Sequence, residues 1–441
     1  MSTLPLPVLQ PKSQGGAGSD IWSRIATLLR SRAKARSTYA VADQVVYSFG
    51  NMVVAALMSR HCAPQQFGIY ILTQRTMDVL IQLSNVFLWA PFTFNLPGTP
   101  TTRRAGYQGS TLGLQLVLCV LFSLLLGAAT CLPVVSSRAE FYGTFAPLVW
   151  AGSGILFREF TRRMYFAHLR LAEAFWTDLA TVTLQIAGVY LLYRAHHLDV
   201  SHTLYVLCAG SVAVSLWWIF KEWPGWQFRL EDAHGDMRNN LRLGRWFLGS
   251  NMIFMVTSQC NPWVLSGVMG SSAVGAYSVC ESVVNIPRVA LTSMQNIMAP
   301  MVARAHNDGG RAGVRSVVRR LDRALLLGSI VFAVAIWGVG PLVARLIFRT
   351  VPGDVRTVLV LLALNLIAYA ATLAQSYGLT ALGRADTTLY ANGLGLLAQA
   401  AACVLLVRSF HIPGAAAAML IGSLLTLCAR EYFFRREVQA A

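Results

Sequence analysis

Charged side chains are scarce in this chain, because only 12% of its 441 residues are Asp, Glu, Lys or Arg. A soluble globular protein carries about 25%. Hydrophobic residues make up 55% of the chain, and the mean hydropathy is +0.52. This composition argues against an ordinary soluble enzyme and indicates one polytopic membrane bundle.

Acidic residues are few as well, with 19 Asp and Glu against 36 Lys and Arg, which gives a net charge of +17. Such a balance can indicate a nucleic-acid-binding protein. The basic residues lie between apolar runs, however, and nucleic-acid-binding folds lack that layout. We therefore expect the membrane, and no nucleic acid, as the partner of the positive charge.

Catalytic and cofactor motifs are also missing from the sequence. It has no HExxH, no P-loop and no GxSxG, and its eight cysteines form no CxxC pair. The group His196, His197, Asp199 and His202 could bind a metal, but its pattern favours a solvated turn. We expect no catalytic residue, metal or cofactor, and thus a protein that is not an enzyme.

Twelve stretches are apolar and long enough to cross a bilayer, which needs about 20 residues per helix. They lie at residues 39–60, 69–92, 111–132, 142–161, 175–194, 202–221, 244–266, 273–300, 323–346, 357–380, 387–407 and 413–433. Pro91 is expected to end the second stretch, and Pro287 and Pro300 interrupt the eighth, where proline can kink a helix. The sequence thus predicts an all-α polytopic membrane protein with 12 transmembrane helices.

The basic residues favour one orientation of these helices. With the N-terminus in the cytoplasm, most of the 36 Lys and Arg residues fall in cytoplasmic segments, as the positive-inside rule requires. Arg158, Arg162, Arg163 and Arg170 belong to this group if they lie in the connection after the fourth stretch. Both termini are therefore expected to be cytoplasmic.

The predicted chain has five parts. Residues 1–38 form a disordered tail plus a basic amphipathic helix at the membrane interface. Residues 39–221 form an N-terminal six-helix bundle, 222–243 a cytoplasmic connector, 244–434 a C-terminal six-helix bundle, and 435–441 a short cytoplasmic tail.

A weak internal repeat supports the two bundles. Gln66-Phe67-Gly68-Ile69-Tyr70 lies at the start of the second stretch, and Ala273-Val274-Gly275-Ala276-Tyr277 lies at the start of the eighth. Six helices per half is an even number, so the halves share one orientation and are related by an axis along the membrane normal. We therefore predict two pseudo-symmetric bundles.

Ionisable residues inside the predicted spans gather on the second and eighth stretches. Arg75 and Asp78 lie three residues apart on one, and Glu281 and Arg288 lie seven apart on the other. A seven-residue separation puts two side chains on one face but about 10 Å apart, too far for a direct pair. Charge inside a membrane usually faces water or a partner, so these residues are the main functional candidates.

Two interpretations of these charges stay open. In one, a polar cavity between the halves presents Arg75 and Arg288 to an anionic ligand, since arginine binds phosphate with paired donors. In the other, Asp78 and Glu281 neutralise the arginines in a structural network. The candidate binding site also includes polar residues of the same and adjacent spans: Gln74, Asn85, Asn285, Asn51 and Gln259.

The span plan and two short motifs resemble a known family. Glycine two residues before tyrosine occurs in both repeat motifs, and Ala381-Leu382-Gly383-Arg384 follows the tenth stretch. These features are similar to the polysaccharide transporters, which include O-antigen and exopolysaccharide flippases. That family belongs to the multidrug/oligosaccharidyl-lipid/polysaccharide exporter superfamily, whose fold is MATE-like.

The resemblance implies two V-shaped bundles around a central cavity lined by spans 1, 2, 7 and 8. It also implies a function: flipping an undecaprenyl-diphosphate-linked oligosaccharide across a bacterial inner membrane for surface polysaccharide synthesis. Polysaccharide polymerase and glycosyltransferases of the same pathway would be partners. A cation-coupled multidrug antiporter of the same superfamily, or a membrane-embedded glycan polymerase or ligase, remains the alternative.

Overall fold

The computed structural model describes residues 18–96, 99–222, 230–349 and 351–439. Within these ranges every regular element is helical. The all-α fold predicted from composition and hydropathy is therefore confirmed. The expected disordered tail at residues 1–17 lies outside the described residues.

The first part of the chain forms one group of helices. They are α1 (Gly18–His61), α2 (Pro64–Ser84), the π-helix η1 (Asn85–Trp89), α3 (Ala90–Asn95), α4 (Thr101–Thr130), α5 (Pro133–Ser136), α6 (Ala139–Ala167), α7 (Leu171–Arg194) and α8 (Val200–Glu222). The segment expected to form a separate interfacial helix is the first part of α1, which continues unbroken into the first predicted span.

Pro91 does not end the second span, contrary to the expectation from sequence. The residues that link α2, η1 and α3 all keep right-handed helical backbone angles, so the three form one continuous path. Pro91 falls in the first turn of α3, where the missing N–H is tolerated. The widened turn of η1 directly before it accommodates the proline ring.

The second part of the chain contains four long elements. They are α9 (Leu230–Met269), α10 (Ser271–Ile347), α11 (Val355–Ala381) and α12 (Ala385–Gln439). Two of them fold back on themselves. Gly309 and Gly310 leave helical geometry and divide α10 into two legs, and His411 divides α12 in the same way. The backbone stays helical at Pro287 and Pro300, so the glycines make the reversal.

Counting α2–η1–α3 as one path and α10 and α12 as two legs each, the described residues contain twelve long helices, as predicted. Six helical segments are long and apolar enough by themselves to cross a membrane. They are Thr101–Thr130, Leu171–Arg194, Val200–Glu222, Met301–Ile347, Val355–Ala381 and Asp386–Val438. The chain is thus a multi-pass membrane protein.

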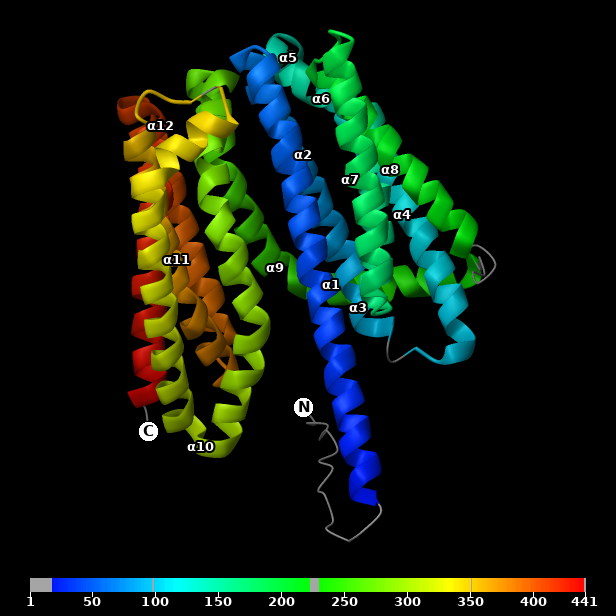
Figure 1. Cartoon of the computed structure of the whole chain (residues 1–441), viewed down its shortest axis with the longest axis vertical. Helices are drawn as coiled ribbons and strands as arrows, with labels where there is room; N and C mark the ends of the chain where they lie inside the picture. The colour runs from blue at the N-terminus through cyan, green and yellow to red at the C-terminus, as the bar shows by residue number, and fades with distance from the viewer. Residues whose placement is uncertain (1–17, 97–98, 223–229, 350, 440–441) are drawn as a thin grey trace.

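The helices form two groups, which Figure 1 shows side by side. Helices α1 to α8 lie on one side and α10 to α12 on the other, with α9 crossing between them. The first turn of α1 and the last turn of α12 lie at the same end of the molecule. Helix α9 already begins at Leu230, inside the predicted connector, while residues 223–229 of that connector lie outside the described residues.

The two repeat motifs pack against each other where α2 meets α10. A methyl group added at Gly68 would lie 1.7 Å from the backbone oxygen of Ser271. One added at Gly275 would lie 2.8 Å from Phe67 Cδ1 and 3.3 Å from the Gly68 nitrogen. Glycine is required here because only its missing side chain lets two helix backbones approach so closely.

We expect Gly68→Ala to separate α2 from α10. Overpacking of a close contact lowers the free energy of unfolding by about 1–3 kcal/mol, which thermal unfolding in detergent would measure. Gly113→Ala is the matched control, because no atom lies within 4 Å of the added methyl. That variant should be as stable as the wild type or slightly more so, and equal behaviour of the two variants would contradict the close contact.

Candidate functional site

An ion pair joins the two halves at the centre of the α2–α10 contact. Arg75 of α2 binds Glu281 of α10 through its guanidinium. The same guanidinium lies 3.8 Å from Asp78, one turn further along α2. Three of the four charged residues predicted from sequence therefore meet, and they come from both halves.

Asp78 is surrounded by polar groups yet exposed. Its neighbours include Arg75 and Glu281, as well as Glu159 of α6 and Gln259 of α9. The Asp78 side chain is nevertheless 51% exposed. Because charge inside a membrane bundle usually faces water or a partner, this exposure is what a polar space beside Asp78 and Arg75 would produce.

Arg288 lies apart from this group. Its Nη1 donates to Asn285 Oδ1 at 3.3 Å, and its guanidinium stacks on the Tyr369 ring of α11 at 5.5 Å. Its Nε is buried without a hydrogen-bond partner in the described structure. As the seven-residue spacing predicted, Arg288 does not pair with Glu281.

The remaining predicted polar residues do not all converge. Gln74 donates to the Tyr70 hydroxyl at 2.8 Å within α2. Asn85 is half-buried at the start of η1, and Asn51 is exposed on α1. Only Gln259 joins Asp78 and the ion pair. The pairing of Arg75 fits the structural-network interpretation, and the exposure of Asp78 fits the cavity interpretation.

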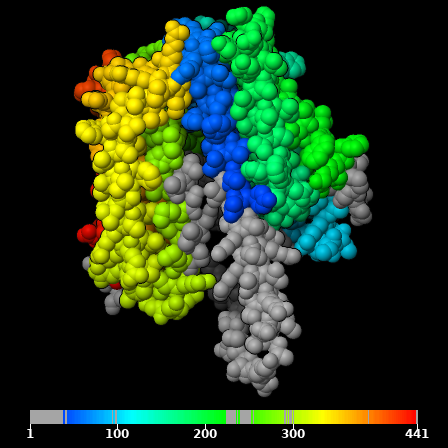
Figure 2. All heavy atoms as spheres, in the orientation of Figure 1, coloured from blue at the N-terminus to red at the C-terminus, as the bar shows by residue number. Residues whose placement is uncertain are grey.

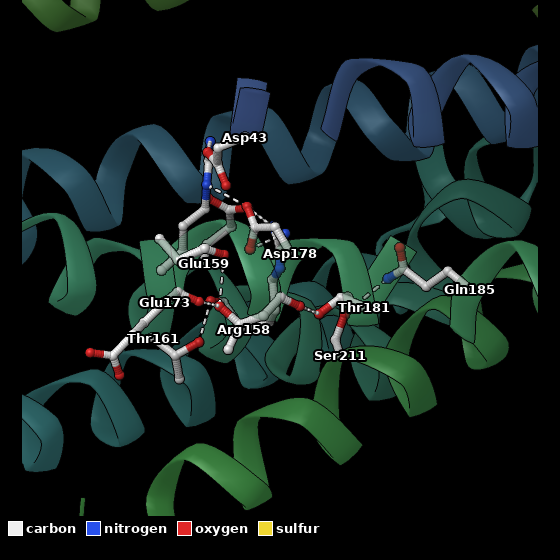
Figure 3. A network of polar contacts seen from close by, with 12 residues as sticks. Asp43, Arg158, Glu159, Thr161, Glu173, Asp178, Thr181, Gln185 and Ser211 are labelled. Carbon is white, nitrogen blue, oxygen red and sulfur yellow. Dashed lines mark hydrogen bonds and ion pairs between the residues drawn. The ribbon is translucent and has the colours of Figure 1, made fainter. Parts of the chain in front are cut away.

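The structure also contains a buried charged cluster that the sequence analysis missed. We call it the α6 cluster: Asp43 of α1, Arg158, Glu159 and Arg162 of α6, and Asp178 of α7. Figure 3 shows Asp43, Arg158, Glu159 and Asp178 converging between the three helices. None of their side chains is more than 10% exposed.

Two arginines connect the carboxylates of the α6 cluster. Arg158 binds Glu159 and lies 2.7 Å from Asp178. Arg162 lies 2.6 Å from Asp43 and 2.8 Å from Asp178. Both guanidiniums also lie 5.0 Å from the Tyr47 ring centre. The cluster thus ties α1, α6 and α7 together with each carboxylate paired.

The arginines of the α6 cluster do not lie where the sequence analysis expected them. Arg158, Arg162 and Arg163 are not in a connection, because α6 continues to Ala167. Asp43 of α1 is fully buried. The four-residue spacing of Arg158 and Arg162 puts both on one helix face, which is the only signal of the cluster in the sequence.

Asp178→Asn should destabilise the protein strongly. Removing one partner of a buried ion network costs about 3–5 kcal/mol because the remaining charge stays buried and uncompensated. The control is Asp386→Asn, whose partner Arg384 lies 3.3 Å away in an exposed pair worth at most about 1 kcal/mol. Thermal unfolding in detergent compares the two, and a similar small shift for both would contradict the role of the α6 cluster.

Residues that were considered for metal binding have another role. Asp199 accepts hydrogen bonds from the His202 backbone N–H at 2.7 Å and from its ring at 2.8 Å. This arrangement caps the first turn of α8. In the part of the chain that the structure describes, no group of three or more His, Cys, Asp or Glu is placed to hold a metal.

The fold matches solved membrane transporters over most of its length. An inward-facing MATE family multidrug-resistance transporter of the MOP superfamily superimposes with a TM-score of 0.71 at 14% identity. The match covers 92% of this chain and 95% of that one. The lipid II flippase MurJ, in an inward closed conformation, gives 0.69 at 11% identity, covering 91% and 89%. The chain therefore has a MATE-like fold, as predicted.

Part of the sequence also matches proteins of polysaccharide biosynthesis. Residues 157–327 match the family described as "Polysaccharide biosynthesis protein". Amylovoran biosynthesis protein AmsL of Erwinia amylovora is 24% identical over 176 residues, which is 39% of this chain and 44% of that protein. The aligned region thus spans less than half of the relative. Over residues 157–327 the chain thus resembles a polysaccharide biosynthesis family, in agreement with the resemblance drawn from its sequence.

Proposed function

We propose that this protein is a flippase that moves an undecaprenyl-diphosphate-linked oligosaccharide across a bacterial inner membrane. Its product would supply surface polysaccharide such as exopolysaccharide or O-antigen. The observation that carries the proposal is the combination of two matches in one chain. Residues 157–327 match a polysaccharide biosynthesis family, and the whole fold matches transporters.

The proposed site is the polar space beside Arg75, Asp78 and Glu281. The Arg75 guanidinium would bind the substrate diphosphate, because its planar fork donates hydrogen bonds in pairs. Glu281 would hold Arg75 in place until the anion replaces it. Arg288 and Asn285, further along α10, would bind a second anionic or hydroxyl group, with Gln74, Asn51, Asn85 and Gln259 as further contacts to the sugars.

Alternating access is the proposed mechanism, and contacts at one end of the molecule support it. Glu140 of α6 accepts a hydrogen bond from the Ser271 backbone at 3.0 Å, and the Ser271 hydroxyl donates to the Gln65 carbonyl at 3.1 Å. The Arg349 backbone donates to Ser59 at 3.2 Å. These bonds join the halves at the end opposite the termini, so opening that end requires them to break.

Two alternatives are less favoured. A cation-coupled drug antiporter needs a carboxylate that is free to bind a cation, whereas Glu281 and Asp78 both lie beside Arg75. A glycan polymerase or ligase would carry a large connection on the outer face. The connections on that face are short: 62–63, 131–138, 195–199, 270, 348–354 and the bend of α12 at His411.

The predicted parts of the chain take their roles within this proposal. The two bundles, 39–221 and 244–434, would rock about the substrate, joined by the connector 222–243. The segment 1–38 would bind the cytoplasmic leaflet, and 435–441 would be cytoplasmic. Polysaccharide polymerase and glycosyltransferases of the same pathway would act after and before the flippase.

Flipping by the purified full-length chain tests the function directly. The protein is reconstituted in liposomes with a fluorescent undecaprenyl-diphosphate oligosaccharide, and a membrane-impermeant quencher reports which leaflet holds the lipid. We expect the protected fraction to become accessible only in liposomes that contain the protein. No protein-dependent flipping, together with drug resistance on overexpression, would favour the antiporter instead.

The double variant R75M/E281L separates binding from structure. Removing Arg75 alone leaves Glu281 unpaired and should cost about 3–5 kcal/mol of stability, whereas replacing both charges with apolar groups is often neutral. We therefore expect the double variant to unfold near the wild-type temperature but to lose flipping. Flipping at the wild-type rate would show that Arg75 is structural only.

A second variant and a control complete this experiment. R75K keeps the charge but loses the paired donors, so it should fold normally and flip more slowly. The group Arg384, Asp386 and Glu437 supplies the control, because R384M/D386L/E437Q removes both ion pairs of Arg384 without touching the α2–α10 contact. That control should flip at the wild-type rate.

A further inference from the structure

Five arginines lie within thirteen residues at the start of the second leg of α10. Arg311, Arg315, Arg319, Arg320 and Arg323 are all exposed, while Val314, Val318 and Leu321 on the same turns are buried. The leg is therefore amphipathic, and its outer face is a row of guanidinium groups about 18 Å long. We call this row the arginine face.

The arginine face borders two connected hollows. The larger, of about 670 Å³, is lined by all five arginines together with Ala312, Ser316 and Val438. The smaller, of about 340 Å³, lies between Arg315 and Arg319 on one side and Glu431, Phe434 and Arg435 of α12 on the other, with Asp322 and Val438. Because Arg315, Arg319 and Val438 line both, the hollows form one groove between α10 and the end of α12.

The carboxylates of the groove do not neutralise the arginine face. Glu431 binds Arg435 of its own helix and accepts a hydrogen bond from Gln375 at 2.6 Å. Asp322 lies near the same Gln375 and is half-buried. Among the described residues, Arg315, Arg319, Arg320 and Arg323 form no ion pair with either acid. Four exposed guanidiniums are thus available to an anion.

The same side of the helix continues directly into an apolar surface. Leu326, Ile330, Val334 and Trp337 follow Arg319 and Arg323 at intervals of three or four residues, which places them on one helix face. These four side chains are 39%, 40%, 62% and 64% exposed, and Figure 2 shows this leg at the molecular surface. Lipid tails would lie against this surface, so the arginines are at the level of the head groups.

From this arrangement we infer that the groove binds the phosphate of a membrane lipid. Arginine pairs with phosphate through two parallel hydrogen bonds, and the adjoining apolar stripe fits the hydrocarbon chain of the same molecule. A soluble anion would use only the arginines. The site is separate from the polar space at Arg75, and the inference does not depend on which substrate is transported.

Binding to the full-length chain in detergent tests the site, with fluorescent phosphatidylglycerol as the probe. R315Q/R319Q/R323Q should weaken binding at least about tenfold, since each removed arginine contributed attraction to an anionic head group. The control R194Q/R356Q/R408Q removes the same charge at other exposed positions and should bind like the wild type. Equal affinity of the two triple variants would overturn the proposal.

Competition experiments and a lysine variant identify which chemical group of the ligand is bound. Diacylglycerol has the tails without the phosphate and should not compete, while undecaprenyl phosphate should compete with phosphatidylglycerol. Inorganic diphosphate should compete only weakly, and competition as strong as that of the lipids would replace the lipid by a free anion. R315K/R319K/R323K keeps the charge but not the paired donors, so binding should fall between that of the wild type and that of the glutamine variant.

Discussion

Charge that lies among transmembrane helices needs either a partner or water, because the hydrocarbon of a bilayer cannot solvate it. The described structure meets this constraint in two places. The α6 cluster pairs its carboxylates and guanidiniums inside the N-terminal group of helices. Arg75 and Glu281 pair between the two groups. The first stabilises one group of helices internally, and the second joins that group to the other.

The fold could be predicted from the sequence because it depends on patterns that the chain repeats many times. Long apolar stretches set the number of helices, and Gly270, with a φ of 85°, separates α9 from α10. The prediction that Pro91 ends the second span was wrong because this proline follows a π-helical turn. A widened turn of that kind leaves no mark in hydropathy.

The candidate site could be predicted only in part. Arg75, Asp78 and Glu281 stood out because charge is rare inside apolar stretches, and they do come together. The α6 cluster was missed because Arg158 and Arg162 lie at the end of an apolar run, where they resemble the basic residues of a cytoplasmic connection. Their partners Asp43 and Asp178 are on other helices, and such pairing depends on packing that one sequence does not contain.

The contact between Gly68 and Gly275 bears on how the chain originated. The two glycines occupy equivalent positions in the two motifs, and they lie against each other. A contact between equivalent positions is what a two-fold symmetric dimer forms on its axis. A six-helix ancestor that associated with a second copy of itself would have made this contact before gene fusion. The glycine of one copy would then have packed against the same glycine of the other copy.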